Sequence, residues 1–307
     1  MPVDLSTTIG SLEFPAPVMT AAGTAGHGAE LSAYVDLSSL GAVVVKSLSA
    51  EPWPGNPAPR VHQTPSGMLN SVGLQGPGVA VWVRDELPGL VERGARVVVS
   101  IWGRSVEDYA AAARSLRVAE DRIVAVEVNL SCPNLDGGAH LFAHDPVATT
   151  DVLRSTEMLE VPRWAKLSAN TDRVVEVARA AQSAGAEAVT LINTLIGMII
   201  DTESRRPLLG GVSGGLSGAA IHPVAVRTVY EVRKAIPDLA IVGAGGVTDA
   251  ITAIELILAG ASAVQVGTAT FADPRAVAKI LDGLRTWCEA HEVSQLRDLI
   301  GGAHQTG

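Results

Sequence analysis

Residues 240–266, AIVGAGGVTDAITAIELILAGASAVQV, contain one complete copy of a pattern that recurs along this chain of 307 residues. The stretch opens with a short apolar run that is typical of a buried strand, and a glycine-rich turn follows. Thr248 can cap a helix that we predict to end at Ala259, and Gly260 can adopt the left-handed conformation that stops it. A second apolar run at 263–266 begins the next unit. The stretch therefore predicts two parallel strands joined by a helix.

Similar units fill most of the chain. Most of the apolar runs are continuous rather than alternating, which is typical of parallel strands covered on both faces. We predict strands at Val18–Thr20, Ala42–Ser47, Arg96–Ile101, Ala125–Leu130, Trp164–Leu167, Ala188–Ile192, Ala240–Val242 and Ala263–Val266. We predict the clearest helices at Val106–Arg117, Thr171–Ala184, Pro223–Ala235, Thr248–Ala259 and Pro274–Ala290, with Ser105 and Thr171 as further caps. Eight strand–helix units predict an α/β fold, a (β/α)8 TIM barrel with insertions on the C-terminal rim.

The main alternative is an open, doubly wound sheet. Against it, no Gly-x-Gly-x-x-Gly follows the first strand, and polar residues end most strands instead of marking a single crevice. Two long segments, 48–80 and 194–222, supply the extra length, and we expect them to form loops on one rim. The residues before Val18 include a turn-like Ile9-Gly10-Ser11 and predict a hairpin across the barrel bottom. We expect one barrel domain over residues 1–307.

The composition excludes several classes of function. The chain carries 23 Lys and Arg against 32 Asp and Glu, a formal charge of −9, and only 4% of its residues are aromatic. It therefore lacks the positive charge and the stacking surface that nucleic-acid binding requires. The apolar runs are too short to cross a membrane, the first residues do not resemble a secretory signal, and two cysteines cannot form a disulfide framework. We expect a cytoplasmic protein, and the charged fraction of 18% favours a homodimer.

Polar residues follow the predicted strands at their carboxyl ends, where a barrel builds its active site. Lys46, Asn129, Lys166 and Asn193 all occupy such positions. A core would not accept two lysines and two asparagines without partners. For any one of them a solvated loop is the simpler interpretation, but their common placement predicts one site at the rim.

The last two units predict a phosphate site. Gly245-Gly246 leads into a helix, and Gly267-Thr268 ends the eighth strand. Glycines let backbone N–H groups approach an anion, and a helix N-terminus adds a favourable dipole. Gly218 can add a further amide. A phosphate at this corner and lysines at the rim suit flavin mononucleotide (FMN), with Lys166 stabilising the negative charge of the reduced ring. The alternative for Lys166 is a lysine paired with a nearby carboxylate.

A thiol lies directly after the fourth predicted strand, in Asn129-Leu130-Ser131-Cys132-Pro133-Asn134. A lone cysteine is usually a small buried hydrophobe, and Cys288 inside the last helix keeps that interpretation. Cys132 differs because Pro133 breaks the strand and glycines follow, which suits a thiol on a mobile loop. The histidines and cysteines show no metal-ligand spacing, so we expect no metal site.

Several primary amides come from the same rim. Asn70, Asn129, Asn134 and Asn193 can both donate and accept hydrogen bonds, which suits a planar heterocycle with alternating N–H and C=O groups. Lys46 can meet a carboxylate on such a ring. Turn formation is the alternative for each asparagine taken alone.

Six of these motifs, in this order, resemble the class 1 dihydroorotate dehydrogenases, and the chain is most similar to the class 1B catalytic subunit. The similarity extends from about Ala22 to Thr268. The motifs are Lys46-Ser47, Asn70-Ser71-Val72-Gly73-Leu74-Gln75, Asn129-Leu130-Ser131-Cys132-Pro133-Asn134, Ala165-Lys166-Leu167-Ser168, Ile192-Asn193-Thr194-Leu195 and Gly214-Gly215-Leu216-Ser217-Gly218.

The resemblance implies an FMN-dependent enzyme that oxidises dihydroorotate to orotate in pyrimidine biosynthesis. It implies that Cys132 is the general base that removes the C5 proton while C6 delivers hydride to FMN. The implied FMN contacts are Ala22, Lys46, Ser47, Ser100, Asn129, Lys166, Ile192, Gly218, Gly245, Gly246, Gly267 and Thr268. The implied substrate contacts are Lys46, Asn70, Ser71, Val72, Gly73, Leu74, Asn129, Asn134, Asn193 and Thr194.

The resemblance also implies a partner. Class 1B enzymes act with a second subunit that carries FAD and an iron–sulfur cluster and passes electrons to NAD. Three residues depart from the family pattern, because Ser100 and Gly76 stand where Asn is usual and His222 replaces a usual Lys. These departures leave two alternatives open, a related FMN oxidoreductase acting on another dihydropyrimidine such as dihydrouracil, and a non-catalytic paralogue.

Overall fold

A ring of eight parallel strands forms the centre of the computed structural model, which describes residues 3–131 and 141–304. Around the ring the strands are β3 (Val18–Thr20), β16 (Ala263–Val266), β15 (Ala240–Ala244), β10 (Ala188–Leu191), β9 (Arg163–Lys166), β8 (Ala125–Asn129), β7 (Val97–Ile101) and β4 (Val43–Val44). A bridge between Met19 and Ala42 joins the first of these strands to the last. The predicted closed barrel is therefore confirmed, although the strand predicted at 42–47 is regular only over its second and third residues.

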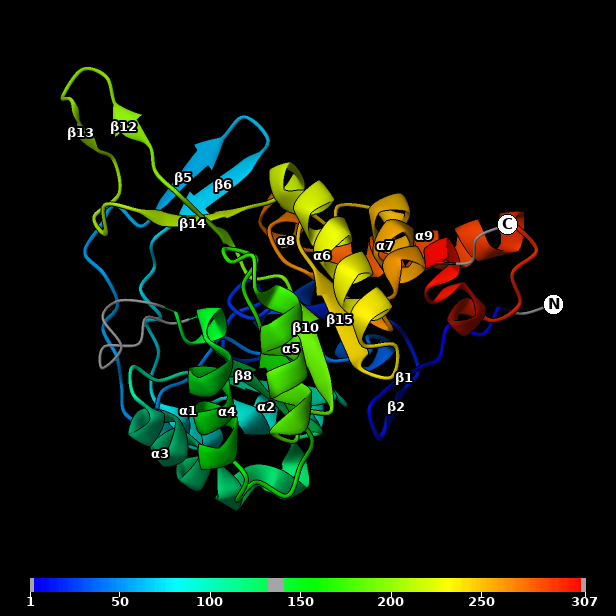
Figure 1. Ribbon diagram of the computed structural model, residues 1–307, viewed down its shortest axis with the longest axis horizontal. Coiled ribbons are helices and arrows are strands. Elements are labelled where there is room, and N and C mark those ends of the chain that lie inside the picture. The colour runs from blue at the N-terminus through cyan, green and yellow to red at the C-terminus, as the bar shows by residue number, and fades with distance from the viewer. Residues whose placement is uncertain (1–2, 132–140, 305–307) are drawn as a thin grey trace.

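Helices lie around the outside of the ring (Figure 1). They are α1 (Val79–Asp85), α2 (Leu87–Glu92), α3 (Val106–Leu116), α4 (Pro146–Ser155), α5 (Val174–Ser183), α6 (His222–Ala235), α7 (Ala250–Ala259), α8 (Ala269–Ala272) and α9 (Ala276–Ala290). Ser105 caps α3 as predicted, in a reciprocal capping box with Asp108. The predicted caps Thr171 and Thr248 are wrong, because α5 begins only at Val174 and Asp249 caps α7. No helix in the described ranges is long and apolar enough to cross a bilayer.

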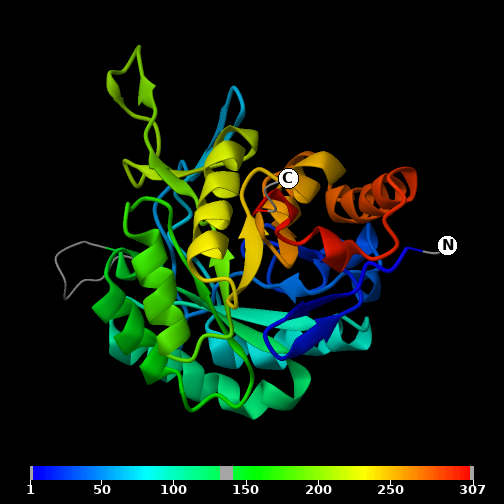
Figure 2. The ribbon, with the colours of Figure 1, turned by 45° about the vertical axis from the view of Figure 1, so that its right-hand side comes forward.

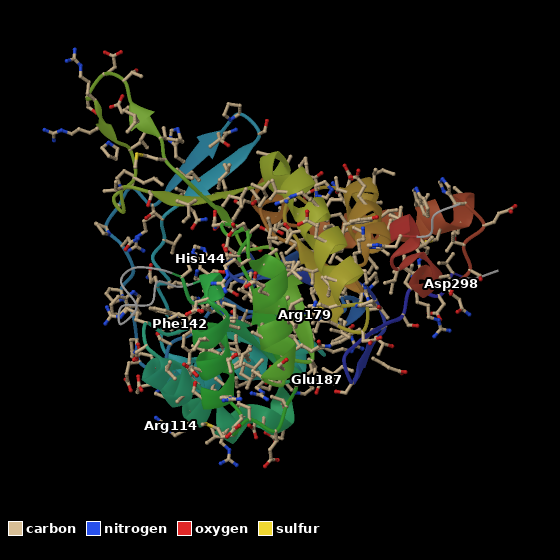
Figure 3. The ribbon with its side chains drawn as sticks, viewed as in Figure 1. Arg114, Phe142, His144, Arg179, Glu187 and Asp298 are labelled. Atoms are coloured by element: carbon tan, nitrogen blue, oxygen red, sulfur yellow. The ribbon has the colours of Figure 1, made fainter. Side chains whose placement is uncertain are left out.

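A hairpin covers the amino-terminal end of the barrel, as the sequence predicts. Its strands are β1 (Thr7–Ile9) and β2 (Leu12–Phe14). Phe14 packs edge-on against Trp164 inside the barrel, with ring centroids 6.0 Å apart. At the turn, Glu187 accepts hydrogen bonds from the backbone N–H of Ser11 at 2.8 Å and from its hydroxyl at 2.6 Å, and Figure 3 shows Glu187 at this end of the molecule. Apolar side chains from the hairpin and the strands therefore fill the lower half of the barrel.

The two long segments meet at the opposite rim, where they form an antiparallel sheet that the sequence analysis does not predict. Its strands, in order, are β11 (Leu195–Gly197), β14 (Gly214–Ser217), β6 (Gly67–Asn70) and β5 (Val61–Thr64). A Cβ at Gly214 would lie 2.4 Å from the carbonyl oxygen of Asn70, so the close pairing of β14 with β6 requires a glycine. A short hairpin projects from this sheet away from the barrel (Figures 1 and 2). Its strands are β12 (Ile200–Asp201) and β13 (Arg206–Pro207).

Candidate active site

A cavity of about 270 Å³ lies between the carboxyl ends of the barrel strands and the rim sheet. Most of the residues predicted from the sequence line it. They are Ala22, Lys46, Ser47, Asn70, Val72, Gly73, Leu74, Asn129, Lys166, Ile192, Asn193, Thr194, Gly218, Gly245, Gly246, Gly267 and Thr268. Residues that are far apart in the sequence thus meet at one place, which is where a barrel carries its chemistry.

Two predicted contacts, Ser71 and Ser100, do not line the cavity. Ser100 is fully buried behind Ser47, and their hydroxyl oxygens lie 2.8 Å apart. Ser71 is buried, and its hydroxyl accepts a hydrogen bond from the side-chain amide of Asn56 at 2.9 Å. The hydroxyls of both serines are therefore bonded to neighbouring side chains.

The predicted base, Cys132, and the predicted substrate contact Asn134 lie outside the described residues. Ser131, the residue immediately before Cys132, lines the cavity.

Asn129 is held at the end of β8 by three hydrogen bonds. Its side chain donates to the Ser47 hydroxyl at 3.3 Å and accepts from the Ser131 N–H at 3.2 Å, and its carbonyl accepts from the Tyr109 hydroxyl at 2.6 Å.

Lys166 lies at the floor of the cavity and is paired with a carboxylate, as the alternative interpretation of this lysine predicts. Its ammonium nitrogen lies 3.5 Å from Glu127 Oε1, and the side chains of Lys166 and Glu127 are 7% and 0% exposed. The sequence analysis does not single out Glu127, which stands inside an otherwise apolar strand. The sequence could have indicated its importance, because a charged residue inside a continuous apolar run needs a buried partner.

The glycine turn after β15 forms the corner where a phosphate is predicted. Gly245 and Gly246 have φ angles of +123° and +68°, a region that L side chains rarely adopt. A Cβ at Gly246 would also lie 2.6 Å from the Cβ of His222, so a side chain would fill this corner. Across the corner, Thr268 donates a hydrogen bond to the Ser217 hydroxyl at 2.8 Å, which joins the end of β16 to the rim sheet. The bare backbone and the start of α6 make this corner suitable for an anion.

His27 lies beside the first lysine of the cavity and is half-buried. Burial lowers the pKa of His27, the charge of Lys46 lowers it further, and Glu30 acts in the opposite direction. The ring atom Nε2 is buried without a hydrogen-bond partner. The neutral imidazole is therefore the favoured form next to Lys46. In the described ranges no group of three or more His, Cys, Asp or Glu side chains is arranged to hold a metal ion.

Known proteins resemble this chain over nearly its whole length. The profile of a family described as dihydroorotate dehydrogenase matches residues 4–287. The chain is 46% identical over 308 residues to the catalytic subunit of dihydroorotate dehydrogenase B (NAD(+)) from Desulforudis audaxviator, with 100% of both chains covered. It is 43% identical over 300 residues to the subunit of the same description from Alkaliphilus metalliredigens, with 97% of this chain and 98% of the relative covered. The corresponding subunit from Bacteroides thetaiotaomicron is 41% identical over 299 residues, with 97% and 98% covered.

Proposed function

Because the chain belongs to the dihydroorotate dehydrogenase family, and its relatives are catalytic subunits of the B type, we propose that it oxidises dihydroorotate to orotate in pyrimidine biosynthesis with the help of bound FMN. The observation that carries the proposal is the cavity itself. Five of the six motifs, from separate strands and loops, bring two lysines and three asparagines (Lys46, Lys166, Asn70, Asn129 and Asn193) to one rim of the barrel.

The residues present fit FMN. The corner is formed by Gly218, Gly245, Gly246, Gly267 and Thr268. A Cβ at Gly246 would occupy the space beside the backbone, so the glycine leaves the room that an anion site requires. The ammonium of Lys166 at the cavity floor would stabilise negative charge on the reduced ring. Bound FMN would supply the hydride acceptor of the reaction. The protein would position the flavin and the substrate, place charged groups beside them and exclude water from the site.

The substrate is proposed to lie under the rim sheet. Lys46 would pair with its carboxylate, and the amides of Asn70 and Asn193 would bind the N–H and C=O groups of the ring. Asn70 already donates one hydrogen bond, to the carbonyl of Gly215 at 3.3 Å, which fixes the plane of its amide. Cys132 would take the C5 proton of dihydroorotate. Its position directly after Ser131, a cavity residue, supports that role.

A partner subunit is proposed to accept the electrons. The relatives are named catalytic subunits of an NAD(+) enzyme, which indicates an assembly with a further component. The two cysteines of this chain cannot hold an iron–sulfur cluster without other ligands. We therefore propose a second subunit carrying FAD and an iron–sulfur cluster. The expected homodimer and cytoplasmic location stay predictions.

An anaerobic titration of the purified protein tests the function. The protein should be yellow, with the absorbance of oxidised flavin, and dihydroorotate should bleach it within a single turnover. Dihydrouracil, which lacks the carboxylate, provides the matched control and should leave the colour unchanged. Bleaching by dihydrouracil alone would favour the related oxidoreductase, and a colourless protein that takes up no added FMN would favour the non-catalytic paralogue.

A further inference from the structure

A layer of polar and charged side chains lies inside the barrel, at and directly below the floor of the cavity. Successive side chains along a strand point alternately into the barrel and away from it. The residue two positions after an apolar interior residue therefore also points inward. On β8, β9, β10 and β16 the apolar residues Ala125, Trp164, Ala188 and Ala263 belong to the lower core. Two positions further on come Glu127, Lys166, Thr190 and Gln265, all of them buried.

The contacts of Glu127 fix the direction of its carboxylate. Its Oε2 accepts hydrogen bonds from the Thr190 hydroxyl at 2.9 Å and from the Gln265 side-chain amide at 2.7 Å. With one oxygen held by two donors, the other oxygen, Oε1, is turned toward Lys166. That atom is buried without a hydrogen bond and lies 3.5 Å from the lysine nitrogen. The carboxylate is therefore oriented by neutral groups and directs its free oxygen at the ammonium.

This arrangement has two consequences for Lys166. A lysine side chain is flexible and tends to extend its charge toward water, and a buried carboxylate below the floor opposes that tendency. The carboxylate also offsets the charge of the ammonium, because opposite charges at this separation interact strongly away from bulk water. A ligand on the floor therefore meets a lysine whose position and net electrostatic effect depend on Glu127.

We infer that Glu127 is a positioning residue that acts through Lys166 to hold down the reduction potential of bound FMN. The inference rests on the proposed function, because it requires that FMN bind in the cavity. Reduced flavin is negatively charged, so an ammonium without a counter-charge would favour the reduced state more strongly. A merely structural role for Glu127 would affect stability and leave the potential where it was.

The test compares midpoint potentials of the FMN-loaded protein, measured by slow reductive titration with a reference dye. No dihydroorotate is needed, so failure of the inference is separate from failure of the proposed reaction. In Glu127→Gln the equilibrium constant for two-electron reduction should rise about tenfold, which corresponds to a positive shift of about 30 mV. Thr190→Val removes one hydrogen bond and keeps both charges, so its potential should shift much less.

A Lys166→Met background shows whether the effect passes through the lysine. Lys166→Met alone should lower the potential, and adding Glu127→Gln to it should cause a smaller shift than in the wild type. An unchanged potential in Glu127→Gln, or the same shift in both backgrounds, would overturn the inference. If Glu127→Gln does not fold, Glu127→Asp replaces it, because the shorter side chain keeps the charge but moves it away from Lys166. A positive shift of the FMN midpoint potential in Glu127→Asp would support the inference, and an unchanged potential would overturn it. A wild-type protein that binds no FMN would instead count against the proposed function.

Discussion

His222 connects the glycine turn after β15 to Glu255 on helix α7. Its Nδ1 lies 2.9 Å from the carbonyl oxygen of Gly245, and its Nε2 lies 2.9 Å from Glu255 Oε2. A carbonyl oxygen can only accept a hydrogen bond, so Nδ1 is the donor to Gly245. The ring thus links Glu255 to the corner where we propose that the FMN phosphate binds. It also fixes the turn whose backbone would bind that phosphate.

Replacing His222 should therefore weaken FMN binding. In His222→Ala the Gly245 carbonyl loses its donor and the glycine turn loses its connection to Glu255, so we expect the dissociation constant of FMN to rise at least about tenfold, or about 1.4 kcal/mol. His222→Lys provides another side-chain donor at this position and should retain most of the affinity. Flavin fluorescence during titration of the apoprotein measures both constants. Equal affinities for His222→Ala and the wild type would show that the connection to Gly245 does not matter for binding.

His27 should make the stability of the protein depend on pH. Its pKa in the folded protein is lowered by burial and by Lys46, so it lies below the unfolded value of about 6.5. As the pH falls, the unfolded chain binds the proton first. The stability linked to neutral His27 is thus fully present above about pH 6.5 and is lost as the pH falls toward the folded pKa.

In His27→Gln the free energy of unfolding should accordingly fall less between pH 7.5 and pH 5.5 than it does in the wild type. Urea unfolding at the two pH values measures the difference. His291→Gln is the matched control, because this exposed histidine lies on the segment after α9 and its replacement leaves the burial of His27 unchanged. The same loss of stability in His27→Gln and the wild type would contradict the prediction.

The barrel and much of the site could be predicted from the sequence because both depend on local patterns. Continuous apolar runs indicate strands covered on both faces, and the polar residues at their carboxyl ends must gather at one rim once the ring closes. Lys46 and Lys166, more than 100 positions apart, meet in this way. The helices were predicted from apolar periodicity and from start and stop signals, although Thr171 and Thr248 were wrongly expected to be caps.

Features that depend on distant pairing could not be predicted in this way. The rim sheet joins Gly215 to Asn70 across 145 residues, and each strand is too short to show a pattern of its own. The partners of Glu127 depend on which residues of neighbouring strands share a layer inside the barrel, and that is set by the register between strands. The sequence shows that a buried charge needs partners, but only the fold identifies them.

The two cysteines should differ sharply in reactivity. Cys288 is fully buried in α9, and burial raises the pKa of its thiol, which disfavours the reactive thiolate. A thiol reagent at neutral pH should therefore modify at most one of the two cysteines before the protein unfolds. Mass spectrometry after brief alkylation counts the modified thiols. Rapid modification of Cys132→Ser, in which Cys288 is the remaining thiol, would show that this part of α9 opens easily.

The same variant tests the proposed base. A serine hydroxyl is close in size to a thiol but is a far weaker acid, so Cys132→Ser has no group that readily takes the C5 proton near neutrality. General acid–base catalysis contributes about 10²- to 10⁴-fold, and we expect reduction of bound FMN by dihydroorotate to slow by at least about 100-fold. Because the predicted FMN contacts are untouched, the variant should keep its flavin and accept electrons from dithionite as the wild type does. Stopped-flow absorbance measures the rate, and dithionite provides the control for an intact flavin site. Reduction by dihydroorotate at the wild-type rate would mean that another group removes the proton.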